Sequence, residues 1–195
     1  FIEEKILPYL TKEICILLNE NKDELKKITW SDNESNIDSG FSSVVKKYCE
    51  IAYKKLDFPY ELRVDTPDIL LSFKKNNFEI NKKIELKSTK SKNGTLPGSM
   101  IMKLDPNIWT IICKRDPNLN TFEIRYGRYF NGMHFSSHEK FQDRSPRPSI
   151  NFNKFQKFYE EPNTTRTKSI TNFWENYAES ALERVLNPLN HSWQD

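Results

Sequence analysis

The sequence predicts an α/β fold with a mixed central β-sheet flanked by α-helices. Apolar residues recur at helical spacing up to residue 56, short β-rich runs follow from residue 60, and helical spacing returns near residue 170. A chain of 195 residues is long enough for one hydrophobic core without disulfides or a structural metal. We therefore expect a single domain over 1–195, with N-terminal helices over 1–58, a central sheet over 60–127, and loops with a C-terminal helix over 128–195.

Two helical regions are predicted before the sheet. Apolar residues follow helical spacing over Ile2–Leu18 with one proline between them, which predicts one or two helices. The Ser-, Asn- and Asp-rich stretch 31–40 has almost nothing to bury and is expected to be a loop. Ser39 or Ser42 is then suited to cap a second helix over Phe41–Leu56.

Short runs rich in β-branched and aromatic residues predict the strands. Asn76-Asn77 and Asp116-Pro117-Asn118 are typical hairpin turns between such runs. The predicted strands are Tyr60–Val64, Asp68–Lys74, Phe78–Ile80, Lys83–Lys87, Trp109–Cys113 and Thr121–Tyr126.

The last third is predicted to combine irregular loops with one helix. Residues 131–168 hold three prolines and little periodicity, and long loops in a compact domain are usually functional. Ile170–Leu186 shows strong helical periodicity, which ends before Pro188 and predicts an amphipathic closing helix.

Composition excludes several classes of protein. The longest apolar run is far shorter than the roughly 20 residues of a membrane span, and no signal-peptide order is present, so we expect a soluble, cytoplasmic protein with no membrane partner. The three cysteines are far apart, which favours buried thiols over disulfides or a zinc site. The net charge of +3 combines an acidic first fifth, with nine Asp/Glu against five Lys/Arg, with a basic remainder.

The most informative residues are Asp68, at the start of one predicted strand, and Glu85-Leu86-Lys87 on a later one. Strand side chains alternate, so Glu85 and Lys87 project from the same face. Two convergent carboxylates form a hard-oxygen site suited to Mg²⁺, with the backbone carbonyl of Leu86 as a further ligand. A cation held there stabilises charge on a phosphate, and the lysine ammonium orients an attacking water. The pattern therefore predicts phosphodiester hydrolysis.

Pro67-Asp68 followed by Glu85-Leu86-Lys87 resembles the PD-(D/E)xK nuclease superfamily, and the continuation Ser88-Thr89-Lys90-Ser91-Lys92 resembles type II restriction endonucleases. The resemblance implies a restriction-endonuclease-like core and Mg²⁺-dependent, sequence-specific cleavage of double-stranded DNA, with Mn²⁺ able to substitute. It implies that Asp68 and Glu85 bind the metal, that Lys87 is catalytic, and that a helical glutamate assists; Glu50 is the matching residue, with Glu61 as an alternative. It also implies a homodimer in a restriction-modification system.

Two basic segments are the predicted DNA contacts. Residues 87–103 hold four lysines and no acid, and their glycines, Gly94 and Gly98, would let the backbone approach phosphate. Residues 140–168 hold seven Lys/Arg, and arginine is the commoner reader of guanine edges. The predicted DNA-binding residues are Lys90, Lys92, Asn93, Ser99, Lys103, Arg144, Arg147 and Asn151.

Three alternatives remain open at this stage. The same catalytic core serves repair or structure-specific nucleases and viral cap-snatching endonucleases, although no histidine precedes Asp68 as in the viral enzymes. A non-catalytic DNA-binding module is the second alternative. In the third, Asp68 caps a turn while Glu85 and Lys87 form an ion pair on an exposed strand face, where the pair would contribute little to stability.

Overall fold

The computed structural model describes residues 1–30, 39–66, 68–98, 105–134 and 148–166, and also residues 175, 178, 179, 182 and 186. Most of the predicted loop 31–40 lies outside these residues. No helix among the described residues is long and apolar enough to cross a membrane.

The N-terminal helices agree with the periodicity of the sequence. A π-helical turn η1 (Ile2–Ile6) continues directly into α1 (Leu7–Glu20), followed by α2 (Lys22–Lys26) and α3 (Ser39–Leu56). Pro8 lies in the first turn of α1, directly after η1; proline has no N–H to donate to the preceding turn, and that turn is π-helical. Ser42 is buried inside α3, so the prediction that it caps the helix is wrong, and capping by Ser39, the first described residue of α3, stays a prediction.

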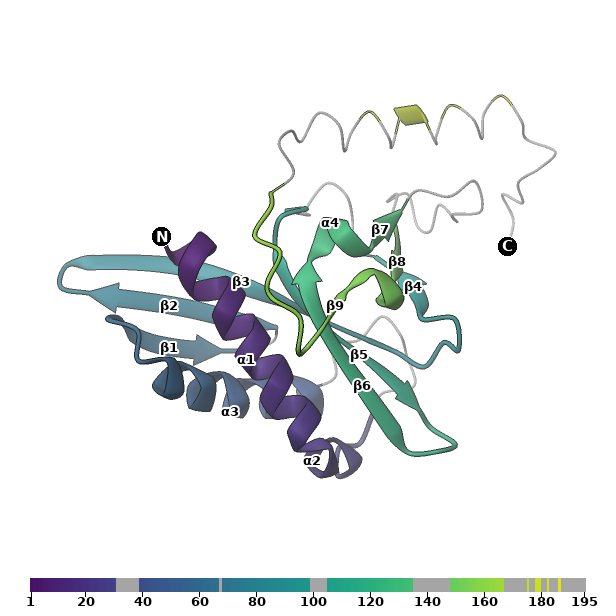
Figure 1. Cartoon of the computed structure of the whole chain (residues 1–195), viewed down its shortest axis with the longest axis horizontal. Coiled ribbons are helices and arrows are strands. Elements are labelled where there is room, and N and C mark those ends of the chain that lie inside the picture. The colour runs from purple at the N-terminus through teal and green to yellow at the C-terminus, as the bar shows by residue number, and fades with distance from the viewer. Residues whose placement is uncertain are drawn as a thin grey trace.

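A six-stranded mixed sheet forms the centre of the molecule, in the order β1-β2-β3-β5-β6-β9 (Figure 1). Its strands are β1 (Glu61–Asp65), β2 (Ile69–Lys75), β3 (Phe78–Thr89), β5 (Trp109–Asp116), β6 (Thr121–Arg128) and β9 (Gln156–Lys157). The pair β3–β5 is parallel, and every other neighbouring pair is antiparallel. The mixed α/β class and both predicted hairpin turns are therefore confirmed, while the two strand segments predicted on either side of residue 82 form one strand, β3.

A small three-stranded sheet was not expected from the sequence. Its order is β4-β8-β7, and its strands come from three distant segments. These strands are β4 (Thr95–Pro97), β7 (Met133–His134) and β8 (Ser149–Asn151), with α4 (Tyr129–Gly132) and the 3-10 turn η3 (Phe152–Lys154) beside them. The prediction of irregular structure after residue 131 is therefore wrong for these segments, because strands of two or three residues are too short to show periodicity.

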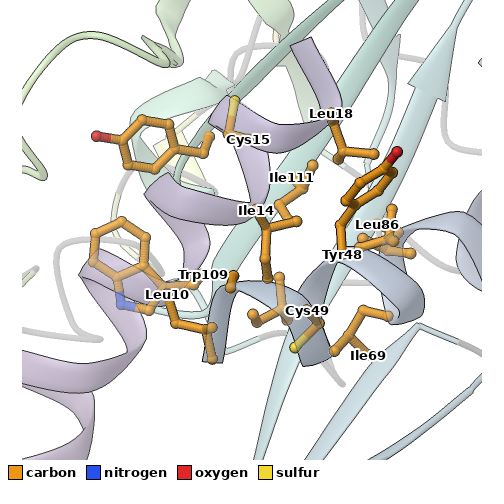
Figure 2. Packing of buried hydrophobic residues seen from close by; sticks show 14 of the residues in the cluster. Leu10, Ile14, Cys15, Leu18, Tyr48, Cys49, Ile69, Leu86, Trp109 and Ile111 are labelled. Atoms are coloured by element: carbon orange, nitrogen blue, oxygen red, sulfur yellow. The ribbon is translucent and has the colours of Figure 1, made fainter. Parts of the chain in front are cut away.

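Helices α1 and α3 pack side by side on one face of the large sheet and bury the main core against it (Figure 1). Figure 2 shows part of this cluster, to which α1 contributes Leu10 and Ile14, α3 contributes Cys49, and the sheet contributes Leu86 and Ile111. All five side chains are nearly or fully buried. The three cysteines are buried free thiols, as predicted.

A second, smaller apolar cluster packs on the opposite face of the sheet. It joins Ile112 of β5 to Leu96, Tyr129, Ile150, Phe152 and Phe155 from the small sheet and its flanking turns. Consecutive residues of β5, Ile111 and Ile112, therefore enter different clusters. The small sheet covers β5 and β6 but leaves part of the same face of β2 exposed, as the 43% exposure of Leu70 shows.

The closing helix is described at five positions only. Residues 175, 178, 179, 182 and 186 are helical, in agreement with the predicted helix. All five are exposed, including Leu182 and Leu186, which were expected on the buried face.

Candidate active site

Strand β3 carries the central residues of the site by simple alternation. Ile84 and Leu86 point into the main core, so Lys83, Glu85 and Lys87 project from the opposite face. Glu85 lies beside Thr110 of β5 in the parallel ladder, and Lys87 lies beside Ile112 of the smaller cluster. The predicted Glu-x-Lys pair therefore lies at the border between the small sheet and the exposed part of this face.

Asp68 is brought to the same place by an unusual backbone conformation. It immediately precedes β2 and has a positive φ of 54°, which places it in the left-handed region. Non-glycine residues adopt this region at a cost in energy, and Asp tolerates it better than most. The Asp68 carboxylate accepts the backbone N–H of Leu86 at 3.1 Å and so extends the β2–β3 pairing by one contact. The hairpin thereby holds Asp68 next to Glu85.

One ammonium group joins the two carboxylates. Lys83 Nζ lies 2.7 Å from Asp68 Oδ2 and 2.8 Å from Glu85 Oε2, and Lys87 Nζ lies 2.8 Å from Glu85 Oε1. The side chains of Asp68 and Glu85 are only 8% and 9% exposed, whereas that of Lys83 is 39% exposed. Two buried acids and two lysines thus form one cluster of balanced charge.

The lysines determine the ionisation of the cluster. Burial acts to raise the pKa of Glu85, but the nearby ammonium of Lys87 and hydrogen bonds from both lysines outweigh it and leave the pKa below its usual value. Burial acts to lower the pKa of Lys83, and its hydrogen bonds to Asp68 and Glu85 reverse this and raise the pKa. Glu85 is therefore a carboxylate and Lys83 an ammonium at neutral pH.

The donor set fits a small divalent cation. Two carboxylate oxygens contact the same nitrogen, so one cation at that position would be within reach of both. Within the described segments, no group of three or more His, Cys, Asp or Glu side chains could hold a metal ion, so water would complete the coordination, as Mg²⁺ prefers. The Thr110 hydroxyl is fully buried beside Glu85 and has no hydrogen-bond partner. Such an unpaired buried group is suited to hold a water.

The other predicted acids lie elsewhere. Glu50 is exposed on α3, which packs on the opposite face of the sheet, so the structure does not bring it to Asp68 and Glu85. Glu61 is exposed in β1 opposite Lys74, at the far end of β2 from Asp68. Leu86 contributes its backbone N–H to Asp68, and the role of its carbonyl as a metal ligand stays a prediction.

The alternative of an exposed surface ion pair is wrong in one respect. Lys87 does pair with Glu85, but Glu85 and Asp68 are both buried and do not lie on an exposed face. Charges buried to this degree are costly unless each has a partner. The cluster is therefore a strongly coupled unit, in which removing one member leaves another with an uncompensated charge.

The structure places three of the predicted DNA contacts together at the end of β3. Lys90, Lys92 and Asn93 are exposed there, and the Lys92 carbonyl accepts a hydrogen bond from Lys114 Nζ at 2.8 Å. Asn151 is partly buried in β8, and its side chain accepts the backbone N–H of Asn153 at the start of η3. Ser99, Lys103, Arg144 and Arg147 lie outside the described residues.

Two basic residues that the sequence did not single out adjoin this segment. Lys114 of β5 and Arg125 of β6 both lie over the ring of Phe152, with the cationic groups 5.9 and 4.6 Å from the ring centroid. Arg125 is also paired with Glu123 at 2.7 Å, which offsets part of its charge. These residues are brought together by long-range strand pairing, so their spacing in the sequence gives no sign of it.

The glycines of the basic stretch have a packing role. Gly94 is buried with φ of 70°, and a Cβ there would meet the Phe152 Cβ at 3.0 Å. Gly98 is buried against Pro148, whose carbonyl would lie 2.5 Å from a Cβ. Protein atoms thus occupy the space that a side chain would take at both positions, and the approach of this backbone to phosphate stays a prediction.

No family model, no curated protein and no solved structure matches this chain.

Proposed function

We propose that the chain is a Mg²⁺-dependent endonuclease that hydrolyses phosphodiester bonds of double-stranded DNA, of the restriction type that its motif resembles. The single observation that carries the proposal is the meeting of buried Asp68 and Glu85 with Lys87 on one face of the sheet. These are the three residues that the resemblance assigns to catalysis. A restriction-endonuclease-like core is part of the same proposal.

Each residue has a distinct role in this proposal. Asp68 and Glu85 hold the cation through carboxylate oxygens, and the hydrogen bond from Leu86 to Asp68 fixes the direction of one of them. The bound cation would supply a Lewis acid that stabilises negative charge on the phosphate. Lys87, on the same face as Glu85, orients the attacking water and takes part of the charge that develops on the phosphate.

The basic segment at the end of β3 supports DNA as the substrate. Lys90 and Lys92 lie just after the end of β3 and are exposed, so they can neutralise phosphates next to the cleaved one. Sequence reading is assigned to Arg144 and Arg147, because paired hydrogen bonds to guanine need the arginine fork. A palindromic target would be matched by a twofold homodimer.

The direct test is cleavage of mixed duplex DNA in Mg²⁺, followed by sequencing of the fragment ends. We expect defined ends from the wild type. Glu85→Gln should reduce the rate on the order of 10³-fold, the scale seen when a group that stabilises the transition state is removed. Glu79→Gln is the matched control, because Glu79 lies on the same strand and face but is exposed.

Two results would overturn the proposal. One is a wild-type protein that cuts no duplex DNA with Mg²⁺ or Mn²⁺, and the other is a folded Glu85→Gln variant as active as Glu79→Gln. Ragged ends would keep the chemistry but replace site-specific cleavage with a general nuclease. Arg144→Ala and Arg147→Ala should relax sequence preference, so an unchanged spectrum of fragment ends would exclude them as base readers.

A further inference from the structure

Lys83 is the one member of the charged cluster that the motif does not include, and its ammonium lies between the two proposed metal ligands. It contacts Asp68 Oδ2 at 2.7 Å and Glu85 Oε2 at 2.8 Å. Both oxygens belong to side chains that are about one-tenth exposed, and so they depend on a cation next to them.

Lys83 and a divalent cation compete for the same oxygens. A magnesium ion requires oxygens at about 2.0–2.1 Å, closer than the ammonium stands now, and two cations sharing these oxygens would repel each other. The lysine can leave because its side chain is 39% exposed, whereas the acids are held by β2 and β3. The Lys83 ammonium and a divalent cation therefore cannot both occupy the position between the two carboxylates.

We propose that Lys83 occupies the cation position in the metal-free protein and is displaced toward solvent when a divalent cation binds. This inference rests on the proposed function, since it assumes that Asp68 and Glu85 bind the cation. In the metal-free protein two acids balance two lysines. After the exchange the acids hold a doubly charged ion, Lys87 remains, and the site becomes net positive toward a phosphate. Lys83 thereby lowers cation affinity and keeps the empty site neutral.

A calorimetric titration of the full chain with Mg²⁺ and with Mn²⁺, without DNA, tests the exchange. Lys83→Met keeps most of the side-chain stem and removes the charge, so it should bind the cation at least about 5-fold more tightly, the lower end of typical coupling between two sites. Lys82→Met is the matched control. Lys82 is the neighbouring residue, on the opposite face, where it pairs with Glu3. The affinity of the Lys82→Met variant for the cation should equal that of the wild type.

A second measurement needs no substitution and covers the case in which Lys83→Met does not fold. Amine acylation followed by peptide mass spectrometry reports how accessible each lysine is. Saturating Mg²⁺ should increase the acylation rate of Lys83 severalfold and leave the rate of Lys82 unchanged. Calcium, which also prefers carboxylate oxygens, should give the same direction of change.

The outcomes separate this inference from the proposed function. One outcome is that Glu85→Gln abolishes cation binding while Lys83→Met leaves the affinity unchanged or weakens it. This would overturn the proposed exchange but would leave the proposed metal site standing. An unchanged acylation rate of Lys83 at saturating cation would also overturn the exchange and leave the metal site standing. If wild type and Lys83→Met both fail to bind either cation, the metal site is absent and both proposals fall.

Discussion

The two faces of strand β3 are made from alternate residues of one short sequence, yet they differ in what they bury. On one face Ile84 and Leu86 pack under α1 and α3 in the main core. On the other, Lys83, Glu85 and Lys87 form ion pairs next to Asp68. On the first face each side chain packs against many apolar neighbours. On the second, four charged groups compensate one another. The same strand therefore supports stability on one side and candidate chemistry on the other.

The largest expected effect on stability comes from the apolar face. Ile111→Ala removes a fully buried side chain next to Leu86 and should lower the unfolding free energy by about 2–5 kcal/mol. Urea denaturation measures the loss, with exposed Leu119→Ala as the control that should change it by less than about 0.5 kcal/mol. Similar losses in the two variants would mean that this face is not the core.

An intermediate effect is expected from acid on the charged face. The pKa of Glu85 is below its usual value in the folded chain, so its stabilising contribution is present above about pH 4.3 and is lost as pH falls through the folded pKa. The difference in unfolding free energy between wild type and Glu85→Gln should therefore narrow as pH decreases below about 4.3. A difference that is constant or grows in acid would contradict the ion-pair assignment.

The smallest effect on stability is expected one residue from Ile111. Thr110→Val keeps the side-chain shape and removes a buried hydroxyl without a hydrogen-bond partner, so the unfolding free energy should stay the same or rise by up to about 1 kcal/mol. If the hydroxyl holds a water of the bound cation, Mg²⁺ affinity should fall about tenfold. A clear loss of stability with unchanged Mg²⁺ affinity would make Thr110 part of the core instead.

The sequence predicted the parts of the fold that follow local patterns. Periodicity gave α1, α3 and all the long strands of the sheet, because each has enough residues to repeat. It missed β4, β7 and β8, whose pairing joins segments near residues 96, 133 and 150. Strands of this length are stabilised by their partners and not by their own composition, so no local signal identifies them.

The candidate site was predictable in its motif and not in its surroundings. Alternation alone places Glu85 and Lys87 on one face, and the same rule places Lys83 there, although Lys83 lies outside the Glu-x-Lys motif. The bridge from Lys83 to Asp68 depends on the left-handed backbone of Asp68, which no spacing predicts. The helical position of Glu50 was correctly predicted, but the face of the sheet that α3 covers is a property of the assembled fold.

The pairing of Asp68 with Glu85 also bears on the order in which the chain folds. Both acids belong to the β2–β3 hairpin, closed by a two-residue turn at Asn76-Asn77, and hairpins form within microseconds. The parallel contact between β3 and β5 must wait for a long connection to close, which makes it slow. The acids and their lysines can therefore meet in an early hairpin, and the walls of the site are added afterwards by segments from distant parts of the chain.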